Sequence, residues 1–187
     1  MRVIGGRFKG KKLLEPKDKE TRPLKDLTKE SIFNIINHSN KFSIEIKKAY
    51  VLDLFSGVGS FGIECLSQGA DHVTFIEKYD GVLPILKKNI NNLKSEINYE
   101  IIENDILNNF EFKSLKLRYD IIFLDPPYKE KALKNILNTI IENKILKDNG
   151  VIIIHRHKKE DDEFPKNFQI LDKKKYGISK LIFGSYS

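Results

Sequence analysis

The chain has 187 residues, of which 40% are hydrophobic, and a single cysteine. This length fits one domain, or one domain with a short extension. No apolar stretch is long enough to cross a membrane, and the first residues lack a signal-peptide core, so we expect no membrane segment. One cysteine excludes an internal disulfide framework and a cysteine metal cluster. We therefore expect a cytoplasmic protein with Cys65 in its core.

The positive charge is concentrated near the N-terminus. The formal net charge is +7, and residues 1–25 carry nine Lys or Arg against three acids. A basic arm on a nearly neutral body is typical of proteins that bind a phosphate backbone. The alternative is a solvated, lysine-rich terminus. The charge pattern divides the chain into a basic arm, residues 1–25, and a domain, residues 26–187.

The arm itself has a short pattern of alternating residues broken by glycines. Residues 2–14 predict an irregular β-hairpin with basic side chains on one face, followed by a polar loop containing Pro16 and Pro23. A helix is expected from about Asp26, which is a suitable N-cap residue.

From residue 50 onward, apolar strand patterns alternate with helical patterns. This alternation with short connections predicts an α/β fold with a parallel sheet covered on both faces. The last two apolar runs predict a closing antiparallel hairpin. The strands are expected at 50–54, 72–76, 99–103, 120–124 and 150–154, the helices at 60–68, 80–94 and 130–146, and the hairpin at 168–183.

A glycine-rich loop follows the first of these strands. Gly57, Gly59 and Gly62 fit the pattern G-x-G-x-x-G, in which glycines permit a tight turn and close approach of a ligand to a helix N-terminus. Glu77 ends the next strand, where a carboxylate can accept both hydroxyls of a ribose. The alternative for Glu77 is a surface acid at a strand end. The loop and the acid together predict a nucleotide-like cofactor.

Two cofactors compete for this pocket. NAD would present a pyrophosphate to the helix, whereas S-adenosylmethionine would present a carboxylate and an ammonium group. Asp53, just before the loop, would repel a pyrophosphate but attract an ammonium group. Asp105 follows the third strand and could bind an adenine amino group, and Ile106 could cover the ring. These acids follow successive strands on one edge of the sheet, where open α/β sheets bind ligands.

The run Asp125-Pro126-Pro127-Tyr128 follows a buried strand. Proline fixes its own backbone, lacks an N–H group and restricts the residue before it, so the corner is rigid. Asp125 and nearby carbonyls can accept hydrogen bonds from an exocyclic amine, and Tyr128 can lie against a planar ring. The alternative is an ordinary tight turn.

The ordered set of motifs resembles the class I S-adenosylmethionine-dependent methyltransferases. It is most similar to the RsmD-type methyltransferases of small-subunit ribosomal RNA, which modify the 2-amino group of a guanine. The similarity covers nearly the whole chain. It rests on the segments Met1–Gly10, Thr21–Pro23 with Asp26, Glu30–Asn34, Leu52–Gly59, Phe75–Lys78, Asp125–Tyr128 and Tyr176–Gly177.

The resemblance implies a doubly wound, mostly parallel seven-stranded Rossmann-like sheet with an N-terminal hairpin extension. It implies S-adenosylmethionine as cofactor and ribosomal RNA or an assembling small subunit as partner. We expect a monomer and no bound metal. The expected catalytic residues are Asp125, Pro126, Pro127 and Tyr128; the cofactor residues are Asp53, Phe55, Ser56, Gly57, Gly59, Glu77, Lys78, Asp105 and Ile106; and the RNA-binding residues are Arg2, Arg7, Lys9, Lys11, Lys12 and Arg22.

The sequence departs from the family in several places. Thr28 stands where an arginine is common, and lysines replace several arginines, which leaves the exact RNA target open. The fifth strand ends with His155-Arg156-His157, where the family often has an acid. Two histidines without a third ligand seldom form a metal site, so we expect them to be structural or to face RNA.

Three other functions remain open at this stage. The nearest is an amino-methyltransferase acting on adenine in DNA or on a protein glutamine, because both use a similar corner of acceptors and an aromatic ring. An NAD-dependent oxidoreductase could use the same glycine loop. An inactive RNA-binding module would keep the basic arm, although the intact Asp-Pro-Pro-Tyr corner disfavours it.

Overall fold

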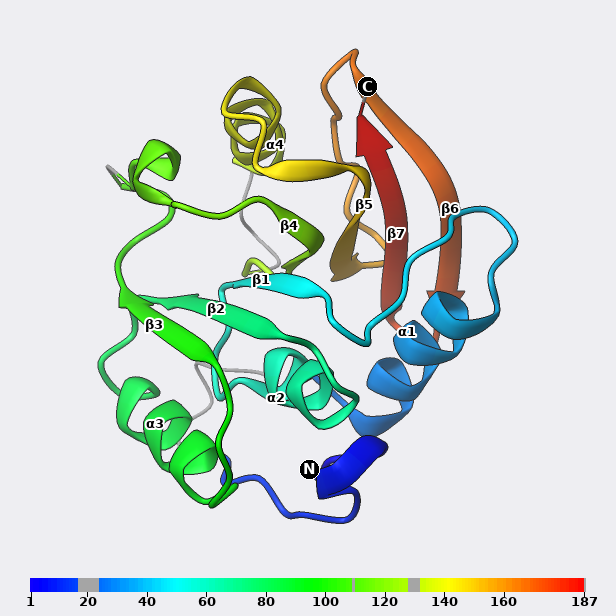
Figure 1. The fold of residues 1–187 in the computed structure, drawn as a ribbon. Coiled ribbons are helices and arrows are strands. Elements are labelled where there is room, and N and C mark those ends of the chain that lie inside the picture. The colour runs from blue at the N-terminus through cyan, green and yellow to red at the C-terminus, as the bar shows by residue number, and fades with distance from the viewer. Residues whose placement is uncertain (17–23, 109, 128–131, 187) are drawn as a thin grey trace.

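A seven-stranded sheet forms the centre of the molecule. The computed structural model describes residues 1–16, 24–108, 110–127 and 132–186, and Figure 1 shows their arrangement. The strand order is β3-β2-β1-β4-β5-β7-β6, and only β7 runs antiparallel to its two neighbours. The strands are β1 Tyr50–Leu54, β2 His72–Glu77, β3 Tyr99–Glu103, β4 Tyr119–Leu124, β5 Leu146–His157, β6 Phe168–Tyr176 and β7 Ser179–Tyr186.

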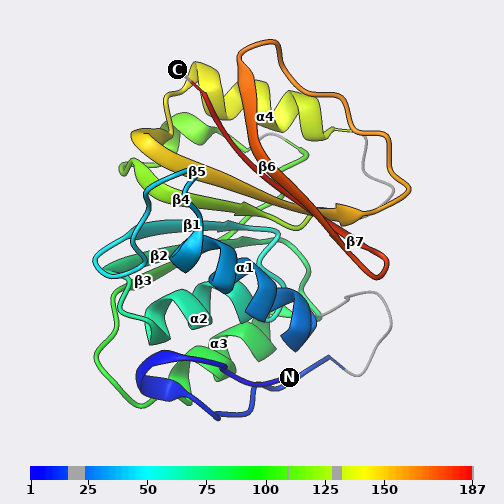
Figure 2. The same ribbon diagram turned by 90° about the vertical axis from the view of Figure 1, so that its right-hand side faces the viewer.

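Helices cover both faces of this sheet. Helices α1 (Asp26–His38), α2 (Ser60–Ser67) and α3 (Leu83–Asn91) lie on one face, and α4 (Leu133–Glu142) lies on the other (Figure 2). Successive strand side chains point to opposite faces. Val51 and Ile121 accordingly belong to the core under α1–α3, whereas Leu52 and Ile122 belong to the core under α4. The expected parallel, doubly covered sheet is confirmed.

Boundaries at α4 and β5 differ from the sequence prediction. The helix expected at 130–146 ends at Glu142, and the strand expected at 150–154 begins at Leu146. Lys144 has a left-handed backbone with φ of 50°, which ends the helix early and turns the chain into the sheet. Apolar periodicity cannot locate such a turn when Ile145 and Leu146 continue the apolar pattern.

The N-terminal segment doubles back, but with less β-structure than expected. One antiparallel bridge joins Arg2 and Lys12, and the bend between them contains a short 3-10 helix, η1 (Gly6–Phe8). Asp26 is the first residue of α1 and Lys25 is its N-cap, so the expected capping role of Asp26 is wrong.

A buried ion pair fixes this segment to the domain. Lys29 of α1 lies 3.4 Å from the Glu64 carboxylate of α2, and both side chains are fully buried. The Glu64 carboxylate also accepts hydrogen bonds from the backbone N–H groups of Ile4 and Gly5, at 2.8 and 2.7 Å. Leaving either charge buried without the other would cost about 3–5 kcal/mol. Residues 1–16 therefore pack as part of the same body as α1 and α2.

Within the described residues, no helix combines the length and apolar character that crossing a membrane requires.

Candidate active site

The glycine loop lies at the carboxyl end of β1 and has an unusual backbone. Gly57 and Gly59 have φ values of 54° and 81°, and Phe55, which is not a glycine, has a φ of 60°. Such a strained non-glycine residue persists only where its surroundings hold it, which is common at functional sites. The Ser56 hydroxyl is buried and has no hydrogen-bond partner among the described residues. An orphaned hydroxyl in this loop is suited to a bound ligand.

Packing requires glycine at two positions, Gly59 in the loop and Gly62 in the first turn of α2. A Cβ at Gly59 would lie 2.5 Å from Leu86, and a Cβ at Gly62 would lie 2.3 Å from Phe75. By contrast, a Cβ at Gly57 would meet nothing within 4 Å, so this face of the loop is open. The loop therefore packs tightly beneath and leaves its outer side accessible.

Asp53 lies beneath this loop and is buried. One of its carboxylate oxygens accepts a hydrogen bond of 3.0 Å from the Gly62 N–H in the first turn of α2. Burial raises the pKa of Asp53 well above its ordinary value, the Gly62 N–H opposes this, and the nearby Asp125 and Glu77 carboxylates raise it further. Three acids from three strands thus share one edge. A cationic ligand would relieve their mutual repulsion.

Glu77 connects β2 to the glycine loop. Its carboxylate accepts hydrogen bonds from the backbone N–H groups of Gly57 at 2.7 Å and of Lys78 and Tyr79 at 2.8 and 2.9 Å. These contacts fix the carboxylate beside Gly57. A carboxylate has about four lone-pair positions, so acceptor capacity remains for a hydroxyl.

Asp105 and its neighbours extend the same edge toward β3. The Asp105 carboxylate binds Lys78 Nζ at 2.9 Å, Asn108 Nδ2 at 2.7 Å and the Leu107 N–H at 3.0 Å. Burial alone would raise the pKa of Asp105, but these hydrogen bonds outweigh it and hold the pKa below its ordinary value. Ile106 is buried and lines a pocket of about 200 Å³ together with residues of α4.

The Asp125 corner contains a contact that sequence reasoning missed. His155 Nδ1 lies 2.8 Å from one Asp125 carboxylate oxygen, Oδ1, and His155 Nε2 lies 2.9 Å from the Ser179 hydroxyl. The second Asp125 oxygen, Oδ2, has no hydrogen-bond partner within the described part of the chain, and 19% of the Asp125 side chain is exposed. The acid is therefore held on one side and open on the other.

A second set of contacts holds the prolines of the corner. Arg156 donates from Nη1 to the Pro127 carbonyl at 3.0 Å and from Nε to Asp162 at 2.8 Å. Lys180 of β7 also pairs with Asp162 at 2.8 Å. These charged groups are nearly fully buried, and buried charges require such pairing. Tyr128, the last residue expected in the corner, lies outside the described residues.

The register of the sheet explains how these side chains meet. Leu124 of β4 is aligned with Ile154 of β5, and β5 is aligned with β7 so that His157 lies opposite Ser179. Asp125 and His155 each follow an aligned pair and therefore project on the same face. The signal in the sequence was the polar run His155-Arg156-His157 after an apolar strand, but its meaning depends on a register that the sequence alone does not display.

The described part of the basic arm, residues 1–16, lies along α2 rather than beside the corner. Lys29 Nζ binds both the Arg2 carbonyl and the Ser60 hydroxyl, so Arg2 is near the start of α2. The Phe8 N–H binds Ser67 at the other end of α2. An eight-residue helix is about 12 Å long, so the bend of the arm is roughly that far from the carboxyl edge of the sheet.

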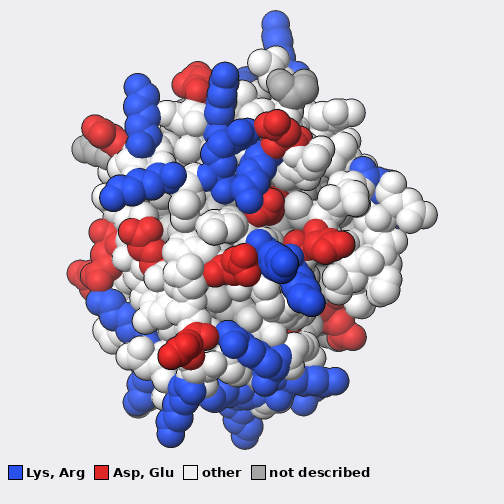
Figure 3. Space-filling model, viewed as in Figure 1, with Lys and Arg blue, Asp and Glu red and all other residues white. Residues whose placement is uncertain are grey.

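The basic residues of the arm face solvent to different degrees. Lys and Arg side chains gather along the lower edge of Figure 3, where Figure 1 places the N-terminal segment. The Arg7 guanidinium lies 4.6 Å from the centre of the Phe8 ring, and Lys11 Nζ lies 5.9 Å from it. Arg2, Arg7, Lys9 and Lys12 are exposed, Lys11 is half-buried, and Arg22 lies outside the described residues.

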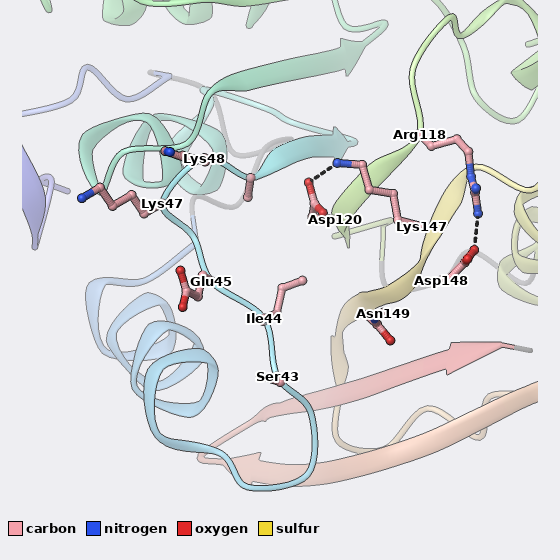
Figure 4. Close-up of a pocket in the computed structure, with 11 residues that line it drawn as sticks. Ser43, Ile44, Glu45, Lys47, Lys48, Arg118, Asp120, Lys147, Asp148 and Asn149 are labelled. Atoms are coloured by element: carbon pink, nitrogen blue, oxygen red, sulfur yellow. Dashed lines mark hydrogen bonds and ion pairs between the residues drawn. The ribbon is translucent and has the colours of Figure 1, made fainter.

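A larger pocket, of about 510 Å³, lies at the opposite edge of the sheet. Figure 4 shows that two of its acids are paired with cations: Lys147 pairs with Asp120 at 2.8 Å, and Arg118 pairs with Asp148 at 2.7 Å, whereas Glu45 has no ion pair with a described residue. It lies at the amino ends of β1, β4 and β5, away from every residue of the glycine loop and the Asp125 corner.

The strand order and the glycine loop after β1 define the class I methyltransferase fold, a Rossmann-like sheet with an antiparallel seventh strand. A solved structure from Escherichia coli, yhhF, provisionally described as a methyltransferase, has a TM-score of 0.81 and 28% identity to this chain. That comparison covers 100% of this chain and 97% of the other. The predicted fold class is confirmed.

The family model described as "Conserved hypothetical protein 95" matches residues 1–185, and the chain belongs to this family. The Haemophilus influenzae protein named "Ribosomal RNA small subunit methyltransferase D" is 33% identical, over 95% of this chain and 90% of that protein. The protein of the same name from Buchnera aphidicola subsp. Acyrthosiphon pisum is 34% identical, over 92% and 86% of the two chains. The expected RsmD-type resemblance is confirmed.

Proposed function

We propose that this protein transfers a methyl group from S-adenosylmethionine to the exocyclic 2-amino group of a guanine in small-subunit ribosomal RNA. The main support for this proposal is the position of the Asp125 carboxylate. His155 holds one of its oxygens, and the other has no partner among the described residues in a side chain that is 19% exposed. The names of the relatives support ribosomal RNA as the substrate class.

The loop residues fit the cofactor. S-adenosylmethionine supplies a methyl group on a positively charged sulfur and carries an ammonium group, which suits an edge where Asp53, Glu77 and Asp125 repel one another. Glu77 would accept the ribose hydroxyls, with Lys78 beside it. Asp105 and Ile106 would hold the adenine. Phe55, Ser56, Gly57 and Gly59 would form the wall of the site. The same acids disfavour the pyrophosphate of NAD, which argues against an oxidoreductase.

Asp125 is the residue that positions the amine and accepts its proton. The guanine amine is a weak nucleophile because its lone pair is delocalised, so positioning carries much of the catalysis. Asp125 Oδ2, with carbonyls of the Pro126-Pro127 corner, accepts the amine N–H bonds and directs the nitrogen toward the methyl carbon. As the C–N bond forms and the C–S bond breaks, the nitrogen becomes positive and loses a proton, which Asp125 can accept.

The RNA would be held by basic side chains and a flat ring. Tyr128 is proposed to stack on a base turned out of its helix or loop. Arg2, Arg7, Lys9, Lys11, Lys12 and Arg22 are proposed to contact phosphates. Because η1 is distant from the carboxyl edge, RNA that reaches both would have to lie along α2.

The proposal is tested by Asp125→Ala. We expect binding of S-adenosylmethionine to remain within about twofold of wild type, measured by calorimetry, and methyl transfer to fall by about 100-fold or more. Methyl transfer at the wild-type rate by this variant would remove Asp125 from the reaction.

A further inference from the structure

We propose that His155 is a positioning residue that fixes Asp125 for methyl transfer. This inference rests on the proposed function, because it assumes that Asp125 receives the amine. The His155 side chain is only 7% exposed and bridges β4 and β7 through its two ring nitrogens.

The hydrogen-bonding partners define the ring's orientation. An ionised carboxylate can only accept hydrogen bonds, so Nδ1 carries the proton that is shared with Asp125 Oδ1. Nε2, on the other side of the ring, lies 2.9 Å from the Ser179 hydroxyl. This arrangement uses Asp125 Oδ1 and leaves Oδ2 without a partner among the described residues. Without the ring, the carboxylate could rotate, and misplacement by about 1 Å can cost about 100-fold in rate.

The experiment compares replacements that differ in hydrogen bonding. His155→Leu removes the donor, and we expect kcat to fall by about 10-fold or more with the KM for S-adenosylmethionine within about twofold of wild type. His155→Asn places an amide N–H near the position of Nδ1 and should recover most of that loss. His72→Leu is a matched control, because His72 is also buried and bonds a hydroxyl, that of Thr74, at the opposite edge.

Several outcomes would overturn the inference. Wild-type kcat in His155→Leu would do so, and so would an equal loss in His155→Asn and His155→Leu. If His155→Leu does not fold, Ser179→Ala is decisive: it loosens the ring, and an unchanged kcat would contradict the inference. Loss of activity in Asp125→Ala together with full activity in His155→Leu would refute this inference and leave the proposed function intact.

A separate observation concerns the basic surface nearest the corner. We propose that the β6–β7 turn and the start of the loop after β5 form a second RNA-binding surface, made of Lys158, Lys159, Lys173, Lys175, Tyr176 and Ile178. This proposal also rests on RNA being the substrate. All six residues are exposed, and Tyr176 and Ile178 are 40% and 46% exposed.

The sheet places this surface beside Asp125. Ile178 directly precedes Ser179, which contacts His155, and His155 contacts Asp125. The Lys158 N–H donates to the Ile178 carbonyl at 2.8 Å, so the loop and the turn are joined. Figure 2 places the β6–β7 turn at the same side of the sheet as the end of β5.

Charge and shape favour a nucleic acid at this surface. No described carboxylate pairs with Lys158, Lys159, Lys173 or Lys175, whereas Asp162 of the same loop is occupied by Arg156 and Lys180. Asp161 is an exposed acid on the loop. Exposed lysines and an exposed aromatic ring at the same end of the sheet are suited to phosphates and to stacking on an unpaired base.

The test is the salt dependence of RNA affinity with full-length protein and a small-subunit ribosomal RNA fragment. Lys158→Ala/Lys159→Ala should weaken affinity by about 5-fold or more and reduce the slope of log K against log salt by 1–2. Tyr176→Ala should weaken affinity by about 5-fold or more with little change in slope. The control is Lys113→Ala/Lys116→Ala, which removes the same charge from exposed positions before β4. It should change neither the RNA affinity nor the salt slope.

A double variant with the wild-type slope, or one that matches the Lys113→Ala/Lys116→Ala control, would exclude this surface. If the wild-type protein itself binds no RNA, the proposed substrate is wrong. This result differs from the one that excludes only the surface, so the two proposals fail separately.

Discussion

The two edges of the sheet carry similar residues but hold them differently. At the amino edge, Asp120 and Asp148 are each paired with a cation, in a pocket of about 510 Å³. At the carboxyl edge, burial and the nearby Asp125 and Glu77 carboxylates raise the pKa of Asp53, and the loop above it contains a strained Phe55 and a Ser56 hydroxyl with no partner among the described residues. Ion pairs thus occupy two acids of the larger cavity, whereas the carboxyl edge holds a buried acid and a buried hydroxyl that lacks a partner among the described residues. Unsatisfied groups therefore indicate the functional site better than cavity size does.

The largest expected effect at the carboxyl edge outside the Asp125 corner is that of Asp53→Asn. The amide oxygen can still accept the Gly62 N–H, but the negative charge is gone. We expect affinity for S-adenosylmethionine to fall by about 10-fold, because an attraction to its ammonium group is lost. Calorimetric titration measures this, and unchanged affinity would contradict the proposed role of Asp53.

The same substitution should change the pH dependence of stability. The folded-state pKa of Asp53 is raised, so the folded state keeps a proton that the unfolded state has lost. Wild-type stability should therefore fall as pH rises from the unfolded pKa toward the folded pKa. Asp53→Asn cannot lose this proton, so we expect it to be more stable than wild type at neutral pH. Denaturant unfolding of the free protein across pH 4–8 tests this, and an identical pH slope would refute it.

The smallest effect is expected at the amino edge. In Asp120→Asn, the Tyr50 N–H keeps an acceptor, and the lost pair with Lys147 is partly exposed, so stability should fall by less than about 1 kcal/mol. Methyl transfer should stay within about twofold of wild type. A loss of activity by 10-fold or more would show that the amino-edge pocket takes part in function. It would contradict the assignment of function to the carboxyl edge alone.

The sequence predicts the parts of the molecule that depend on local patterns. Alternating apolar runs located β1 and β3 correctly, and glycine spacing located the turn between β1 and α2. Local patterns do not report long-range register. The contact of His155 with Asp125 depends on how β4 aligns with β5, and the position of the arm depends on the buried pair of Lys29 and Glu64. The end of α4 depends on a left-handed lysine that composition does not reveal.

The central claim is methyl transfer to a guanine amine at the carboxyl edge of the sheet. The most direct measurement is incorporation of labelled methyl from S-adenosylmethionine into undermodified small-subunit ribosomal RNA, followed by nucleoside mapping. We predict label in 2-methylguanosine with wild type and with Asp120→Asn, and none with Asp125→Ala. Label in another nucleoside, or no label from wild type on either free RNA or small-subunit particles, would contradict the account.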